Sequence, residues 1–189
     1  MYKILTVQDT VRVPPSRFEE SLEEAIADIL RKTYEGIMDK DAGVVLAITE
    51  VKNIGPGKII MGDGASYHDV TFDALTYKPE LQELILGEIV EIVEFGAFVR
   101  LGPMDGLIHV SQVTDDFVGH DRKKGSLYGK ETKRSLKEGD KVRARIVTVS
   151  IKRGVAGATG GGGKIGLTMR QPGLGKLEWI EEERKGTKA

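Results

Sequence analysis

A chain of 189 residues has room for one or two domains, because domains usually contain roughly 100–150 residues. With 40% apolar and 30% charged residues and no apolar run long enough to span a bilayer, the composition predicts a folded cytoplasmic protein with no membrane partner. The absence of cysteine and the wide separation of the three histidines argue against disulfides, thiol nucleophiles, a zinc site or any other metal centre.

The N-terminal part predicts a strand followed by a helix. Short alternating apolar stretches occur within residues 2–13, and Pro14-Pro15 ends them. Residues 16–19, Ser-Arg-Phe-Glu, have the form of a capping box, so we expect the helix to begin at Ser16. Apolar residues then recur at helical spacing and predict a buried face: Phe18, Leu22, Ala25, Ile26, Ile29 and Leu30. The acidic residues between them predict a solvent-exposed face with no catalytic role.

Three further strands are expected after this helix. The apolar runs at residues 44–48, 58–61 and 70–74 are separated by glycine-rich turns. One of these turns, Gly62-Asp63-Gly64, lacks the residues that complete a phosphate-binding loop, so a tight turn is the better interpretation. The pattern breaks at Lys78-Pro79. We therefore predict an α+β domain over residues 1–79, with the helix packed on an antiparallel sheet.

The second half contains the more specific pattern. Strand-like segments occur at residues 87–94, 95–101, 105–111, 139–147 and 164–170, and the second and third read FGAFVRL and DGLIHVS. In this order they resemble the S1 domain, an RNA-binding, five-stranded OB-type barrel. The resemblance implies an all-β barrel domain over residues 80–189, with an insertion at about 112–138 and a charged C-terminal tail. Gly157 and Gly160 to Gly163 predict a flexible loop before the last strand.

Two phenylalanines predict how such a barrel binds RNA. In a regular strand Phe95 and Phe98 would point to opposite faces, because they are an odd number of residues apart. A bulge at Gly96-Ala97 would bring both rings to one face, where unpaired bases could stack on them. The alternative is that both rings fill the barrel. The S1 resemblance implies that His109 and Lys164 join this platform, and it places Ser150 where many S1 domains have an acidic residue.

Positive charge is concentrated between residues 119 and 153, which contain twelve Lys and Arg against four Asp and Glu. Such a cluster is typical of a surface that binds phosphates, although a solvated lysine-rich loop is the alternative. Lys141, Arg143 and Arg145 alternate with apolar residues, which predicts one basic and one buried strand face. We therefore include these three cations among the expected RNA-binding residues.

A longer resemblance covers both halves. The segment from Gly62 to Leu75, the Tyr77-Lys78-Pro79 that follows, and residues 95–112 together are similar to the family of E-prime subunits of archaeal RNA polymerase, the counterpart of the seventh subunit of eukaryotic RNA polymerase II. The resemblance implies an N-terminal tip domain that docks on the polymerase core and a heterodimer with the small helical F subunit. It also implies binding of emerging single-stranded RNA, with no catalytic residue and no cofactor in this chain.

Two alternatives remain open at the level of sequence. An S1 domain also occurs in exosome caps and in translation-associated RNA-binding proteins, which co-purification would distinguish from a polymerase subunit. The second alternative is an enzyme whose barrel holds the substrate, but the sequence contains no aspartate cluster with magnesium-site spacing and no serine nucleophile motif.

Overall fold

The computed structural model describes residues 1–121, 125–155 and 163–186. The chain divides into two units, Met1–Lys78 with Ile151–Gly162, and Pro79–Ser150 with Gly163–Ala189. By their contacts the described residues 151–155 group with the first unit, although they lie within the range expected for the second domain. Most of the expected glycine-rich loop (157 and 160–162) and the basic residues 122–124 lie outside the described residues.

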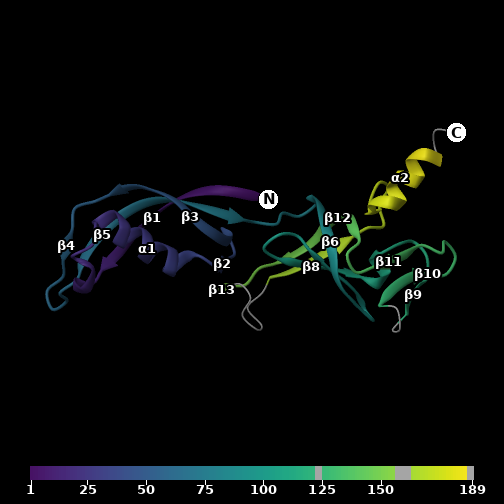
Figure 1. Ribbon diagram of the computed structural model, residues 1–189, viewed down its shortest axis with the longest axis horizontal. Helices are drawn as coiled ribbons and strands as arrows, with labels where there is room; N and C mark the ends of the chain where they lie inside the picture. The colour runs from purple at the N-terminus through teal and green to yellow at the C-terminus, as the bar shows by residue number, and fades with distance from the viewer. Residues whose placement is uncertain (122–124, 156–162, 187–189) are drawn as a thin grey trace. The chain divides into compact units, whose positions relative to one another are not determined.

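The first unit is an antiparallel sheet with the helix α1 (Leu22–Tyr34) packed on one face (Figure 1). Its strands run in the order β1-β5-β3-β2-β13, and β4 pairs with β5 off this path. Their bounds are β1 (Tyr2–Val13), β2 (Ile37–Asp39), β3 (Gly43–Ile54), β4 (Lys58–Ile59), β5 (Ser66–Tyr77) and β13 (Gly154–Val155). The expected α+β domain is confirmed.

Alternation of side chains explains why this sheet has one apolar and one polar face. Val11, Val13 and Phe72 are buried against Ala25, Ile26 and Leu30 of α1. On polar positions of the same strands, Asp73 accepts a hydrogen bond from Thr6 at 2.6 Å and pairs with Lys52 at 2.7 Å. The bond from the Lys52 ammonium and then that from Thr6 lower the pKa of Asp73, so this carboxylate remains charged in the folded protein.

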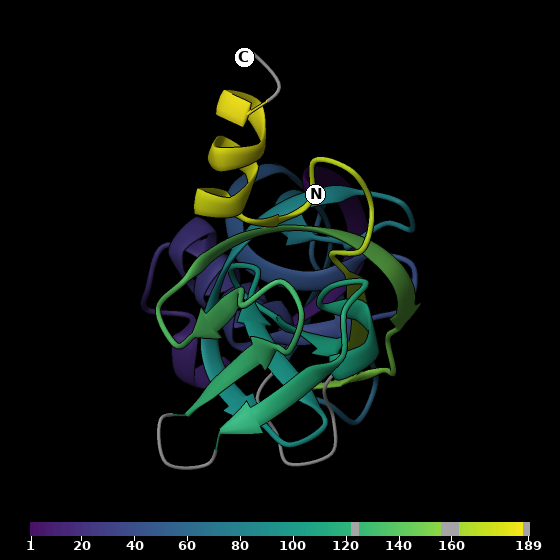
Figure 2. The ribbon, with the colours of Figure 1, turned by 90° about the vertical axis from the view of Figure 1, so that its right-hand side faces the viewer.

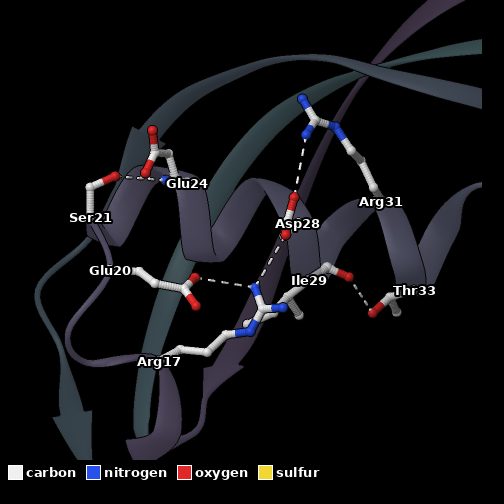
Figure 3. A network of polar contacts seen from close by, with 8 residues as sticks. All are labelled: Arg17, Glu20, Ser21, Glu24, Asp28, Ile29, Arg31 and Thr33. Atoms are coloured by element: carbon white, nitrogen blue, oxygen red, sulfur yellow. Dashed lines mark hydrogen bonds and ion pairs between the residues drawn. The ribbon is translucent and has the colours of Figure 1, made fainter.

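Helix α1 begins later than the sequence pattern predicted. Ser21 is the N-cap, and its hydroxyl accepts from the backbone N–H of Glu24 at 3.3 Å (Figure 3). Ser16 instead lies in a 3₁₀ turn, Pro15–Arg17, so the predicted start was wrong. Both Ser16-Arg17-Phe18-Glu19 and Ser21-Leu22-Glu23-Glu24 fit a capping box, and the second precedes the helix. Phe18 is consequently outside the helix and 54% exposed, and Leu22 in its first turn is 41% exposed.

The second unit is a closed barrel of five strands. β6 (Leu84–Val93), β7 (Gly96–Arg100) and β8 (Asp105–His109) form a meander, β14 (Lys164–Thr168) pairs in parallel with β8, and β12 (Lys141–Ser150) pairs with both β14 and β6. The β12–β14 pairing closes the sheet on itself. The interior contains alternate residues of each strand, such as Val99, Ile108 and Ile146, all fully buried. The expected OB-type barrel is confirmed.

Additional elements surround the barrel. The region of the predicted insertion contains a small sheet of β9 (Val118–Asp121), β10 (Ser126–Gly129) and β11 (Ser135–Lys137). After β15 (Gly175–Lys176), which pairs with β12, the helix α2 (Leu177–Gly186) extends away from the barrel (Figure 2). Neither helix in the described part of the chain is long and apolar enough to cross a membrane.

Candidate nucleic-acid interface

The rings of Phe95 and Phe98 lie together, but the backbone geometry that brings them together differs from the predicted bulge. Phe95 is in the turn between β6 and β7, just before β7 begins, so strand alternation does not determine where its ring points. Its ring centroid is 6.4 Å from that of Phe98, and the ring planes are 85° apart. Phe95 is 51% exposed and Phe98 is partly exposed, so neither ring fills the barrel.

No bulge occurs at Gly96-Ala97, and this part of the prediction was wrong. Strand β7 pairs with β8 in regular register, and the irregularity lies on β6, between Ile89 and Glu91. Gly96 serves a different purpose, because a Cβ at this position would overlap the carbonyl oxygen of Ile108. The glycine therefore allows β7 to approach β8 closely where the turn enters the strand.

A groove of about 510 Å³ runs across the outer surface of the barrel. Its floor is a row of cross-strand neighbours from four strands: Phe98, Leu107, Gly166 and Thr148. The row presents an aromatic ring and an aliphatic side chain, and at Gly166 the Thr148 hydroxyl occupies the space that a Cβ would take. A flat apolar ligand can therefore lie on Phe98 and Leu107. Phe95 is outside the groove lining but contacts the ring of Phe98.

Besides Phe98, two more of the expected RNA-binding residues, His109 and Lys164, line this groove. Lys164 is exposed at the start of β14, opposite Ser150 of β12. The Lys164 ammonium is exposed and has no ion pair within the described ranges, so it can pair with a phosphate. His109 is exposed at the end of β8, and its Nδ1 lies 2.8 Å from the hydroxyl of Ser111.

Gln112 also lines the groove, and sequence reasoning missed it. Its Oε1 accepts a hydrogen bond from the hydroxyl of Thr168 at 2.8 Å. Its role depends on this hydrogen bond to a residue 56 positions later in the chain, although Gln112 directly follows the DGLIHVS segment that contains His109. A polar residue immediately after a matched motif was the signal that could have identified it.

The three basic residues of β12 alternate as predicted but do not line the groove. Val142, Ala144 and Ile146 are fully buried, whereas Lys141 is exposed and Arg143 and Arg145 are partly exposed. The groove reaches β12 at Val147 and Thr148. Arg145 is two residues from this edge and Lys141 is six, or roughly 20 Å along an extended strand. The cations thus form a line that leads away from the groove along β12.

Carboxylates near the barrel have structural roles in the described residues. Asp105 lines the groove but lies 3.7 Å from Arg100 on the neighbouring strand. Asp116 accepts from the backbone N–H groups of Glu131 and Thr132, both at 2.9 Å, which lowers the pKa of its carboxyl and anchors the insertion. Within the described ranges no cluster of His, Asp and Glu has the arrangement of a metal site.

Comparison with known proteins agrees with both units. The SHS2 domain found in N terminus of Rpb7p/Rpc25p/MJ0397 matches residues 8–64, and the S1 RNA binding domain matches residues 78–159. The DNA-directed RNA polymerase subunit Rpo7 of Saccharolobus shibatae is 45% identical over 185 residues, which cover 98% of this chain and 100% of that protein. The chain belongs to the Rpo7 family.

More distant relatives match less of the chain. DNA-directed RNA polymerase III subunit RPC8 of Bos taurus is 29% identical over 108 residues, covering 57% of this chain and 53% of that protein. The structure of Mycoplasma genitalium RNase R with ribose methylated single-stranded RNA is 30% identical and covers 37% of this chain and 11% of that one, with a TM-score of 0.36. Membership of the Rpo7 family confirms the expected resemblance. It also confirms that the chain is a subunit of a nucleotidyltransferase complex, with no catalytic site of its own.

Proposed function

We propose that this Rpo7-family chain is a stalk subunit of DNA-directed RNA polymerase that binds emerging single-stranded RNA in the groove of its barrel. The groove built on Phe98, Leu107, Gly166 and Thr148 is the observation that supports this best. Stacking on an aromatic surface tolerates any base, which suits a protein that must hold transcripts of every sequence. The proposed place of action is the cytoplasm.

The groove and the basic line along β12 have different parts in this proposal. Bases stack on Phe98 and Phe95, while His109 and Lys164 bind the polar edge and the phosphate of the same nucleotides. A strand longer than the groove continues along β12, where its phosphates meet Arg145, Arg143 and Lys141 in turn. Short RNA would therefore use the groove alone, and longer RNA would use the whole track.

We further propose that the chain docks on the polymerase core through the N-terminal domain, residues 1–79, and forms a heterodimer with the small helical F subunit. Exposed apolar side chains in each unit support partner contacts. In the first unit Ile59, Ile60 and Met61 are 80%, 52% and 101% exposed. In the second unit Leu81 is 62% exposed, just before β6. A contiguous exposed apolar run such as residues 59–61 is typical of a surface that binds another chain.

A pull-down of the tagged chain from native extract, read by mass spectrometry, tests the assembly. Core polymerase subunits and a small helical partner should be recovered together. Recovery of exosome or ribosomal proteins in place of polymerase subunits would favour the S1-bearing alternatives. Expression alone should give poorly soluble protein that becomes soluble on co-expression with the partner, whereas a monodisperse monomer would contradict an obligate heterodimer.

A further inference from the structure

The polar end of the groove presents its hydrogen-bond donors in a fixed arrangement, beginning with His109. The backbone N–H of Ser111 donates to Nδ1 of His109 at 3.3 Å, and the Ser111 hydroxyl is 2.8 Å from the same nitrogen. A nitrogen that accepts from a backbone N–H carries no proton, so in the neutral imidazole the proton is on Nε2. His109 therefore offers a donor at its free ring nitrogen.

Gln112 is oriented by two successive hydrogen bonds through Thr168. The backbone N–H of Arg170 donates to the Thr168 hydroxyl at 3.3 Å, and that hydroxyl donates to Oε1 of Gln112 at 2.8 Å. Thr168 is only 4% exposed, so its hydroxyl is held within the protein and cannot exchange this bond for one to water at low cost. With Oε1 engaged, the amide has its two N–H donors left for a ligand, and the groove is lined by this side chain.

The groove thus combines two amide N–H donors and one imidazole N–H donor with the Lys164 ammonium. The carboxylate that lines it, Asp105, faces a competing cation in Arg100 at 3.7 Å. A ligand that pairs with His109, Gln112 and Lys164 must supply acceptors. Among the bases, uracil has two carbonyl oxygens, whereas adenine has none and presents an amino group beside its ring acceptors.

We propose that Gln112 and His109 select bases that carry carbonyl oxygens, uracil above adenine, for the nucleotide that lies on Phe98. This inference rests on the proposed RNA-binding function and adds a base preference to it. Stacking alone would give a higher affinity for adenine than for uracil, or equal affinities, because a purine covers more of an aromatic ring than a pyrimidine does. The preference therefore distinguishes hydrogen-bond selection from stacking.

The test measures binding of the full-length chain, with its helical partner where that is needed for solubility, to oligo(U) and oligo(A) of equal length. Gln112→Glu replaces the amide donors by a carboxylate oxygen and retains an acceptor for Thr168. Gln171→Glu is the matched control, since Gln171 is exposed and outside the groove lining but the charge change is the same. Self-stacking of oligo(A) lowers its affinity equally for every variant. This effect therefore cancels when the U-to-A affinity ratio is compared between variants.

The wild type should bind oligo(U) more tightly, and Gln112→Glu should reduce the U-to-A affinity ratio by roughly fivefold, which corresponds to one net hydrogen bond. Gln171→Glu should leave the ratio unchanged. Tight binding of both oligonucleotides with the same ratio in wild type and Gln112→Glu would overturn the base preference and leave the RNA-binding proposal standing. Failure of the wild type to bind either oligonucleotide would overturn both.

Discussion

The ring of Phe95 meets the ring of Phe98 nearly at right angles, with their centroids 6.4 Å apart on the outer surface of the barrel. This geometry arises because the turn before β7 contributes one ring and the strand contributes the other. An edge-to-face pair stabilises the aromatic surface without filling the core, which Val99 and Ile108 occupy instead. Loss of either ring should therefore affect ligand binding more than folding.

The first prediction concerns Phe95→Ala, Phe98→Ala and His109→Ala. Each phenylalanine replacement should weaken binding of single-stranded RNA by about 1–3 kcal/mol, because a base no longer stacks on that ring. His109→Ala should weaken it by about 1 kcal/mol, the net contribution of one hydrogen bond. Fluorescence anisotropy with a labelled oligonucleotide measures the affinity, and circular dichroism checks that the barrel remains folded.

Phe117→Ala is the matched control for these aromatic replacements. Phe117 is 77% exposed beside β9 and lies outside the groove lining, so its loss should leave RNA affinity within experimental error. Equal affinity for wild type and the Phe95 and Phe98 variants would rule out stacking at this site.

The second prediction uses the salt dependence of binding to map the RNA path. Each phosphate contact on single-stranded RNA contributes roughly 0.7 to the slope of log affinity against log salt, because counterions are released. Lys164→Gln should reduce this slope for short and long oligonucleotides, since Lys164 lines the groove. Lys141→Gln should reduce it only for long ones, since Lys141 is distant from the groove on β12. A salt response independent of RNA length in both variants would contradict a track along β12.

Much of the fold could be predicted from the sequence because alternation and turn residues are local signals. The predicted runs at residues 44–48 and 70–74 lie within β3 and β5, and the FGAFVRL and DGLIHVS segments contain β7 and β8. The run at residues 58–61 forms only the two-residue strand β4. The start of α1 could not be predicted, because two neighbouring Ser-x-x-Glu patterns both fit a capping box. The tertiary packing of the residues that follow decides which of the two serines caps the helix. Pairing of Gly154–Val155 with β2 could not be predicted from the sequence either, because it joins residues far apart in the chain.

The site was partly predictable for the same reason. Phe98, His109 and Lys164 lie on adjacent strands, and the motif order alone placed them on one barrel. The relation between the groove and the basic face depends on strand pairing, because Arg145 pairs with Thr168 while Lys141 pairs with Glu88 at the other end of β12. Gln112 acquires its role only through its hydrogen bond with Thr168, 56 residues later in the chain.

The third prediction tests the corrected helix start. Ser21→Ala removes the hydroxyl that accepts from Glu24, which should destabilise the first unit by about 1 kcal/mol. Ser16→Ala is the control, because Ser16 lies in the preceding 3₁₀ turn and caps no helix, so the free energy of unfolding should be nearly unchanged. Urea unfolding followed by circular dichroism measures both. Similar losses in the two variants would show that Ser21 is not the cap that matters.

The fourth prediction concerns alkaline stability and Tyr34. Burial of the ring, followed by the hydrogen bond that its hydroxyl donates to Asp9, raises the pKa of Tyr34 to about 12. An unfolded tyrosine titrates near 10, so above that pH the unfolded chain loses this proton while the folded chain keeps it. The stabilisation by protonated Tyr34 is therefore complete below pH 10 and disappears as the pH rises through the folded-state pKa.

Tyr34→Phe should accordingly cost about 1 kcal/mol at pH 8 through the lost hydrogen bond, while the ring still packs 5.3 Å from that of Phe72. The difference in melting temperature between wild type and variant should shrink steadily from pH 10 upward, because only the wild type has this proton to lose. Tyr128→Phe provides a comparison at an exposed tyrosine on β10. A wild type and a Tyr34→Phe variant that lose stability in parallel above pH 10 would show that Tyr34 does not control the alkaline transition.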